Sequence, residues 1–264
     1  PMWILVPALI PFAVFPFGPV LLLVSFLVTQ QITDLNIGVL YILAFAGLGV
    51  YGIVLAGWAS NSKYSLLGGI RATAQMISYE LAAGLSIIAV FMLSETLSLR
   101  EIVALQHLDL WGVCSFVPNW YIFTPPLAFC LFIVTGLAEI NRTPFDMPEA
   151  ESELVSGFCT EYSSMKYALF FMAEYANMIV IAAIAVTLFL GGWSAPFNIS
   201  ILTMIPGFVW LLLKIYALMF FFMWLRATFP RVRYDQLMRL GWTVLLPLAL
   251  ANVLVTGLVV VILK

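Results

Sequence analysis

The sequence predicts an all-α protein, a polytopic bundle of about seven transmembrane helices. Of its 264 residues, 64% are hydrophobic and only 9% are charged, whereas a soluble domain carries about 25% charged residues. Apolar runs of about twenty residues recur along nearly the whole chain, which is the length needed to cross a hydrocarbon core of about 30 Å. A surface with so little charge suits lipid and does not suit water.

The expected spans follow from these apolar runs. In chain order they are 2–28, 38–58, 70–94, 121–140, 167–190, 207–228 and 242–263. The first span holds several prolines, which remove backbone donors, so we expect it to be kinked or partly unwound: Pro7, Pro11, Pro16 and Pro19. The whole chain, 1–264, reads as a single transmembrane domain.

Basic residues in the connections predict the orientation of the bundle. One side of the predicted membrane has only Arg100 and Lys264. The other side has Lys63, Arg71, Arg142, Lys166, Arg226, Arg231, Arg233 and Arg239. Because basic residues near span ends resist translocation, we expect the richer side, with the loop 141–166, to face the matrix or cytoplasm.

Several function classes find no support in the composition. The formal net charge is −2, so there is no electrostatic case for a nucleic-acid partner. Cys114, Cys130 and Cys159 lie far apart, and His107 has no neighbour at ligand spacing. We therefore expect no metal and no cofactor bound by this chain.

The loop 141–166 concentrates charge between two apolar runs. Asp146, Pro148 and Glu149 match a capping box that opens a short helix. The remaining acids of the loop are Glu151, Glu153 and Glu161. Spacing leaves two interpretations open: a solvated interfacial helix that contacts a soluble partner, or a group of carboxylates that stores protons at the membrane surface.

Four ionisable residues fall inside or at the end of predicted spans: Glu80, Glu139, Glu174 and Lys214. Such residues cost roughly 2.5–3.5 kcal/mol each at the centre of a membrane helix, so they should face the bundle interior or water. They either fix helix packing through satisfied hydrogen bonds or exchange protons. Polar neighbours favour the second interpretation, a water chain leading inward from the loop: Gln75, Ser78, Tyr79, Tyr175 and Asn177.

Long motifs in this chain resemble those of a known family. They are 57-GWASNSKYSLLGGIRATAQMISYEL-81, 138-AEINRTPFDMPEAESELVSGFCTEYSSMKYALFFMAEY-175, 191-GGW-193 and 226-RATFPRVRYDQLMRLGW-242. In order and over almost the whole chain, they are similar to subunit 1, also called the H subunit, of proton-pumping NADH:quinone oxidoreductase, respiratory complex I.

This resemblance implies a function. Family members form part of the chamber through which quinone reaches the enzyme, and they couple quinone reduction to proton translocation. Buried acids matching Glu80, Glu139 and Glu174, with the acids of the loop, belong to a polar path. Arg142 and Phe145 match residues of the chamber loop, and Lys214 is a weaker match. FMN and iron–sulfur clusters would lie on partner subunits, and the partners would be other complex I subunits, quinone and membrane lipid.

Two departures from the family pattern stand out. Relatives begin with one more transmembrane helix and a basic first loop, which do not appear in this chain, and some have a glutamate where Gly47 stands here. The residues of the motifs resemble those of mitochondrially encoded members, which favours the mitochondrial inner membrane over a bacterial cytoplasmic membrane. Alternative functions are the equivalent subunit of a membrane-bound hydrogenase or ferredoxin-linked complex, a stand-alone ion-coupled transporter, and a passive scaffold.

Overall fold

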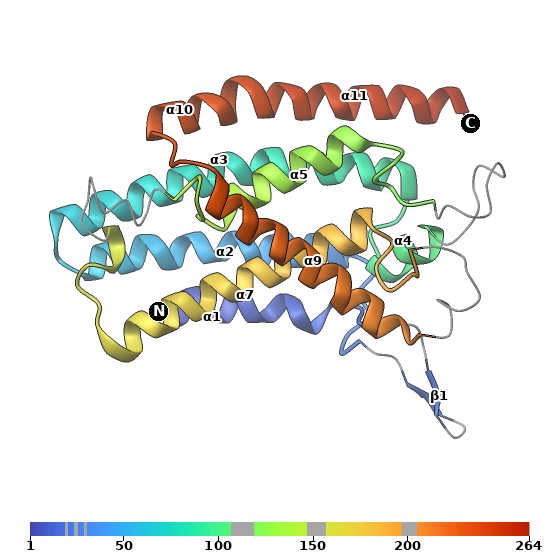
Figure 1. Ribbon diagram of the computed structural model, residues 1–264, viewed down its shortest axis with the longest axis horizontal. Coiled ribbons are helices and arrows are strands. Elements are labelled where there is room, and N and C mark those ends of the chain that lie inside the picture. Colours follow the sequence, from blue (N-terminus) through green and yellow to red (C-terminus); the bar gives the residue numbers. More distant parts are fainter. Residues whose placement is uncertain are drawn as a thin grey trace.

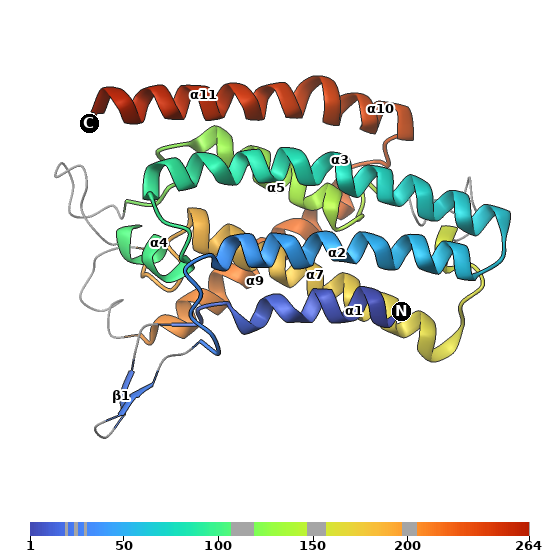
Figure 2. The same ribbon diagram turned by 180° about the vertical axis from the view of Figure 1, so that it is seen from behind.

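We describe the fold from a computed structural model, which covers residues 1–18, 21–23, 26–28, 31–106, 119–146, 157–196 and 205–263. Its long helices lie side by side along one direction, as two opposite views show (Figure 1, Figure 2). Among the described residues, five helices are long and apolar enough to cross a membrane, and two shorter apolar segments, Met2–Ala13 and Pro126–Glu139, accompany them. The predicted helical, polytopic membrane fold is confirmed.

The elements follow the expected spans closely from residue 38 onward. They are α1 (Met2–Leu9), a 3-10 turn (Ile10–Ala13), β1 (Leu21–Leu23), β2 (Phe26–Val28), α2 (Gly38–Ala59), α3 (Lys63–Ser94), α4 (Leu99–Gln106), α5 (Pro126–Glu139), the short turn η2 (Gly157–Cys159), α7 (Ser164–Phe189), α9 (Gly207–Thr228), α10 (Tyr234–Arg239), the π-helical segment η3 (Leu240–Leu245) and α11 (Leu246–Leu263).

The first expected span, 2–28, is wrong in its extent. Helix α1 contains Pro7 and passes into the 3-10 turn, which ends at Ala13. Strands β1 and β2 follow as an antiparallel pair, with Leu21 opposite Val28. Proline supplies no amide hydrogen to a helix, and the prolines at 16 and 19 bracket a glycine, so the apolar run continues while the helix does not.

Helix α3 lies at the centre of the packing. It contacts α2, α5 and α11, while α1 packs against α2 and α7. In Figure 1, α11 runs along one edge of the bundle and α9 crosses α7 obliquely. Helices α2 and α3 approach closely, because a Cβ on Gly57 would lie 2.9 Å from the Ser65 carbonyl oxygen. Such a contact needs glycine, as is common between membrane helices.

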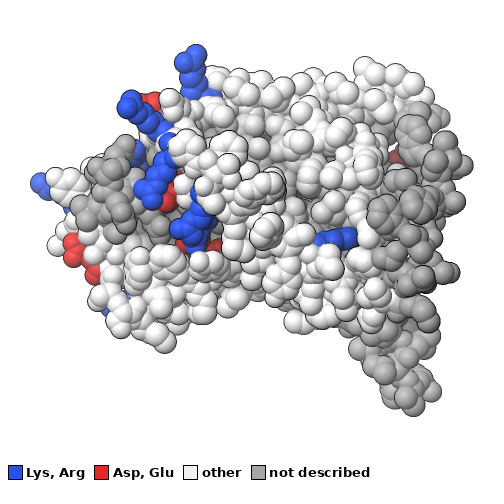
Figure 3. Space-filling model, in the orientation of Figure 1, with Lys and Arg blue, Asp and Glu red and all other residues white. Residues whose placement is uncertain are grey.

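Charged residues gather at the ends of the bundle. Figure 3 shows Lys and Arg side chains collected toward the end that carries the α2–α3 connection and α10. The apolar surface between the ends is exposed, as Leu254 and Val261 on α11 illustrate at 74% and 77% exposure. This distribution fits a belt that faces lipid or neighbouring helices.

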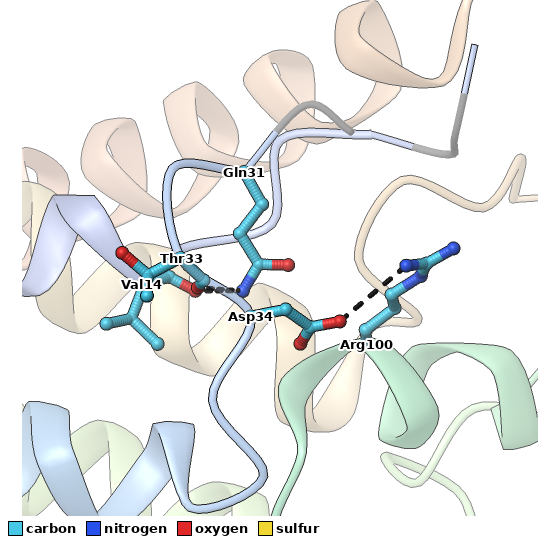
Figure 4. Close-up of polar contacts among 5 residues, drawn as sticks. All are labelled: Val14, Gln31, Thr33, Asp34 and Arg100. Atoms are coloured by element: carbon cyan, nitrogen blue, oxygen red, sulfur yellow. Dashed lines mark hydrogen bonds and ion pairs between the residues drawn. The ribbon is translucent and has the colours of Figure 1, made fainter. Parts of the chain in front are cut away.

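Polar contacts fasten the segment after the hairpin at the opposite end (Figure 4). The Gln31 side-chain amide donates to the carbonyls of Val14 at 2.7 Å and Thr33 at 2.9 Å. Asp34 lies 3.6 Å from Arg100 of α4, and both side chains are 40% or more exposed. An exposed ion pair contributes only about 0–1 kcal/mol. The two hydrogen bonds of the Gln31 amide therefore stabilise this segment more than the ion pair does.

Candidate functional site

The ends of α5 and α7 bring two of the predicted acids to one cavity. Glu139 is the last residue of α5, and Glu174 lies about two fifths of the way along the 26 residues of α7. Together with Asn141 and Asn177 they line a cavity of about 60 Å³ whose other walls are apolar side chains. The structure therefore brings together Glu139, Glu174 and Asn177, which the sequence predicted along one polar path, and adds Asn141 to them.

A second, smaller cavity continues from the first. It measures about 20 Å³ and shares Met76, Glu139 and Asn177 with the larger one. Its remaining walls are apolar, from α2, α3, α5 and α7. Since roughly 10–15 Å³ accommodates one water, the larger cavity has space for several waters and the smaller for about one. Glu139 and Asn177 stand between the two spaces.

Glu80 lies on α3, close to Gly47 of α2. A Cβ on Gly47 would lie 2.6 Å from Glu80 Oε1, so the Glu80 carboxyl occupies the space that a side chain at residue 47 would need. The absence of a side chain at Gly47 therefore allows this position of the carboxyl.

Substituting Gly47 tests the placement of this carboxyl. In Gly47→Ala, we expect the end of the Glu80 side chain to move aside, with little loss of stability and about a tenfold fall in turnover of the assembled enzyme, since small displacements of a working group are costly. Gly84→Ala is the matched control, because a Cβ there meets nothing within 4 Å. Equal turnover in both variants would contradict the prediction.

Arg142 and Glu174 form an ion pair between the start of the loop and α7. The two side chains are 12% and 22% exposed, and the Arg142 guanidinium also lies 4.8 Å from the centre of the Tyr175 ring. A planar guanidinium commonly combines a carboxylate contact with ring stacking. The arginine expected in the chamber loop is thus joined directly to an acid of the expected path.

The first part of the loop is held by the connection between α9 and α10. Asp146 is 7% exposed and lies 3.3 Å from Arg231. The backbone amide of Val232 donates to the carbonyl of Pro144 at 3.1 Å. Residues 144–146 are thus fixed against a segment more than eighty residues further along the chain.

The remaining side chains of the loop lie in different surroundings. Phe145 is buried and lines an apolar groove of about 690 Å³ between α5 and α9. Glu161 is exposed, next to Tyr162, whose hydroxyl donates to the carbonyl of Ala56 at 2.9 Å. Burial raises the pKa of Tyr162, so this phenol stays neutral at physiological pH. Glu149, Glu151, Glu153 and the predicted capping box lie outside the described residues.

Comparison with known proteins decides the family. The model of the NADH dehydrogenase family matches residues 1–257. A curated relative, the first NADH-quinone oxidoreductase H subunit of Geobacter sulfurreducens, is 60% identical over 271 residues, which cover 98% of this chain and 74% of the relative. The chain belongs to the family of the NADH-quinone oxidoreductase H subunit. It is thus a membrane subunit of an enzyme complex, and the resemblance in the motifs is confirmed.

Two further relatives are also named as the H subunit of NADH-quinone oxidoreductase. The protein of Magnetococcus marinus is 51% identical over 97% of this chain and 71% of its own length. That of Thermomicrobium roseum is 53% identical over 94% of this chain and 70% of its own length.

Some polar neighbours of Glu80 are committed to helix packing in this member of the NADH-quinone oxidoreductase family. The Ser78 hydroxyl donates to the carbonyl of Ala74 at 2.6 Å and accepts a hydrogen bond from Trp242 at 3.2 Å. The Tyr79 hydroxyl donates to the carbonyl of Leu237 at 2.9 Å. Of the polar residues expected along the path, Asn177 lines the two cavities, while Ser78 and Tyr79 do not.

Lys214 belongs to α9 and lies away from the acids, against the backbone that follows the end of α7. Its ammonium group donates to the carbonyls of Leu190 at 2.7 Å, Gly192 at 3.0 Å and Ser194 at 2.7 Å. It also lies 4.4 Å from the centre of the Trp120 ring. Three donors meeting three carbonyls close the end of α7, so this contact supports packing. The structure does not bring Lys214 to the Glu139 cavity.

Sequence reasoning missed the pairings that organise the site. It placed Arg142 and Glu174 in separate groups, overlooked Asn141, and assigned no role to the contact of Arg231 with Asp146. The motifs contained each residue, but the contacts depend on helices and loops meeting in space. In the described part of the chain, no three His, Cys, Asp or Glu side chains are grouped as a metal site would require.

Proposed function

We propose that this membrane subunit of NADH-quinone oxidoreductase forms part of the quinone-access chamber and couples quinone reduction to proton translocation. One observation carries the proposal. Glu139 lies between two adjoining cavities, and the larger one is also lined by Glu174, which is paired with Arg142 at the start of the loop. A charge change beside the loop thus has a direct route, through the ion pair, to carboxyls bordered by space for water.

The steps follow from the groups present. Reduction of a quinone to a quinol takes up two electrons and two protons, and FMN and iron–sulfur clusters on partner subunits would supply the electrons. A negative charge arriving beside the loop would attract the Arg142 guanidinium and so weaken its ion pair with Glu174. Glu174 would then exchange a proton with Glu139 through cavity waters, and Glu80 would take part as a further carboxyl on α3, which packs against α5.

The same proposal assigns places to the remaining parts. The basic end of the bundle would face the matrix or cytoplasm, where the loop would meet quinone-site subunits of the peripheral arm. Direct contact of Arg142 and Phe145 with quinone stays a prediction, as do the roles of the acids Asp146, Glu149, Glu151, Glu153 and Glu161. Other membrane-arm subunits and lipid would cover the apolar belt.

The chain is a multi-pass membrane protein, and its compartment is part of the proposal. The mitochondrial inner membrane stays a prediction from the wording of the motifs. Relatives at 51–60% identity come from bacteria, which supports the alternative, a bacterial cytoplasmic membrane.

Replacing Glu139 with Gln tests the proposal. The amide keeps the shape of the side chain and cannot exchange the proton, so in the assembled complex we expect proton pumping to fall about tenfold or more. Pumping is measured with a pH-sensitive dye in sealed vesicles and turnover from NADH oxidation with added quinone. Full turnover with full pumping would contradict the proposal and favour a passive scaffold. Glu101→Gln, in the first turn of α4, is a control carboxylate away from both cavities.

A further inference from the structure

A buried glutamine joins three elements of the site. Gln75 of α3 is fully buried. Its side-chain amide nitrogen donates to the carbonyl of Ala138 at 2.9 Å and to the carbonyl of Phe145 at 2.8 Å. An amide nitrogen carries two hydrogens, so both are used. One side chain therefore holds the end of α5 and the start of the loop against α3.

Both carbonyls lie at points where the backbone changes direction. Ala138 belongs to the last turn of α5 and directly precedes Glu139, and its carbonyl also accepts a hydrogen bond from the backbone amide of Asn141 at 3.3 Å. The chain then reverses at Asn141, which has a φ of 59°. The hydrogen bonds of Gln75 thus span this reversal and set the distance between the Glu139 backbone and the loop.

Further contacts on the same side of α3 strengthen this attachment. The Tyr79 ring, one helical turn after Gln75, packs against the Phe145 ring with centroids 6.0 Å apart. Arg71, one turn before, lies 4.9 Å from the centre of the Tyr234 ring at the start of α10. Helix α3 thus holds the loop and also the α9–α10 connection that contacts it.

We propose that Gln75 is a positioning residue, whose amide transmits displacement of the loop start to the carboxyl of Glu139. The inference rests on the proposed coupling function and adds to it the element that connects loop and carboxyl. Gln75 is needed for this because a glutamate at the same place would present oxygen to two carbonyl oxygens, and a methionine would donate nothing.

A second observation assigns the holding role to the amide nitrogen and not to the oxygen. Gln75 Oε1 is buried and accepts no hydrogen bond from the described residues. A buried acceptor without a partner reduces stability, so the part of this side chain that holds the structure is its amide nitrogen, which donates to both carbonyls. These two donors fix the geometry of the loop start relative to α5.

The chain offers a closely matched control. Gln106 of α4 is also buried, and its amide nitrogen donates to the carbonyls of Thr187 and Leu188, each at 3.1 Å. These carbonyls lie near the far end of α7, away from Glu139. Gln106→Met therefore removes the same kind of double hydrogen bond without touching the loop.

The test compares Gln75→Met with Gln106→Met in the assembled complex. We expect both to lower the thermal midpoint, but only Gln75→Met to reduce protons pumped per NADH, to shift the pH profile of turnover and to slow turnover about tenfold. Equal proton ratios and pH profiles in the two variants would overturn the inference. If Gln75→Met does not assemble, Gln75→Asn, whose shorter amide cannot reach both carbonyls, should show a smaller fall in the same ratio, and an unchanged ratio would count against positioning.

The outcome also separates this inference from the function on which it rests. If Glu139→Gln abolishes pumping while Gln75→Met leaves the proton ratio unchanged, the path stands and the positioning role fails. If Glu139→Gln leaves pumping intact, the coupling function itself fails.

Discussion

Complexes that carry Arg142→Met are expected to lose most of their quinone reductase activity and much of their thermal stability. The substitution leaves the Glu174 carboxylate in a largely buried place without its guanidinium. Breaking a buried ion pair by removing one partner costs about 3–5 kcal/mol. Stability is measured by thermal denaturation of the purified complex, and activity by NADH oxidation with a soluble quinone.

A double variant separates the pair from its members. In Arg142→Met with Glu174→Gln, the buried charge is gone, so we expect stability to recover toward the parent while proton pumping stays low. Arg226→Met, which removes an exposed arginine from the last turn of α9, is the control and should change neither quantity. Recovery of pumping together with stability would show that the pair serves packing alone.

Lys214→Met is expected to destabilise the protein by several kcal/mol and to reduce the amount of assembled complex. It removes three hydrogen bonds, two of them to buried carbonyls, and each buried group left without a partner costs about 1–3 kcal/mol. We expect the complexes that do assemble to pump with the parent ratio of protons to NADH, because the structure places Lys214 away from the Glu139 cavity. Native gels give the assembled amount, and sealed vesicles give the ratio.

Lys63→Met is the matched control for this change, since Lys63 is an exposed cation at the start of α3. It should assemble normally. A lowered proton ratio in Lys214→Met at normal stability would place Lys214 in the proton path, against the packing role that its contacts indicate.

The fold was predictable wherever apolar length alone determines it. The expected spans 38–58 and 207–228 agree with α2 and α9 to within one residue. The first span failed because a hairpin of leucine, phenylalanine and valine has the same composition as a membrane helix. The short helix α4 was missed for a related reason: its amphipathic pattern covers only eight residues.

The site was predictable in its residues and not in its contacts. Glu139 and Glu174 stand out because a carboxylate in an apolar run is costly, whatever its partner. The partner itself, Arg142, is 32 positions from Glu174 along the chain, and no local pattern links them. Gln75 is harder still, because an amide in a membrane helix looks the same whether it contacts water or backbone. Only the folded arrangement shows which carbonyls it meets.

The length of α3 has a mechanical consequence. Its 32 residues, at about 1.5 Å each, form a rod about 48 Å long, while the oily slab of a bilayer is about 30 Å thick. The rod must therefore protrude beyond the slab or lean within it. A peripheral protein bound to a protruding end of α3 would transmit force along the helix. A small tilt of α3 would then displace every side chain that anchors neighbouring elements to it.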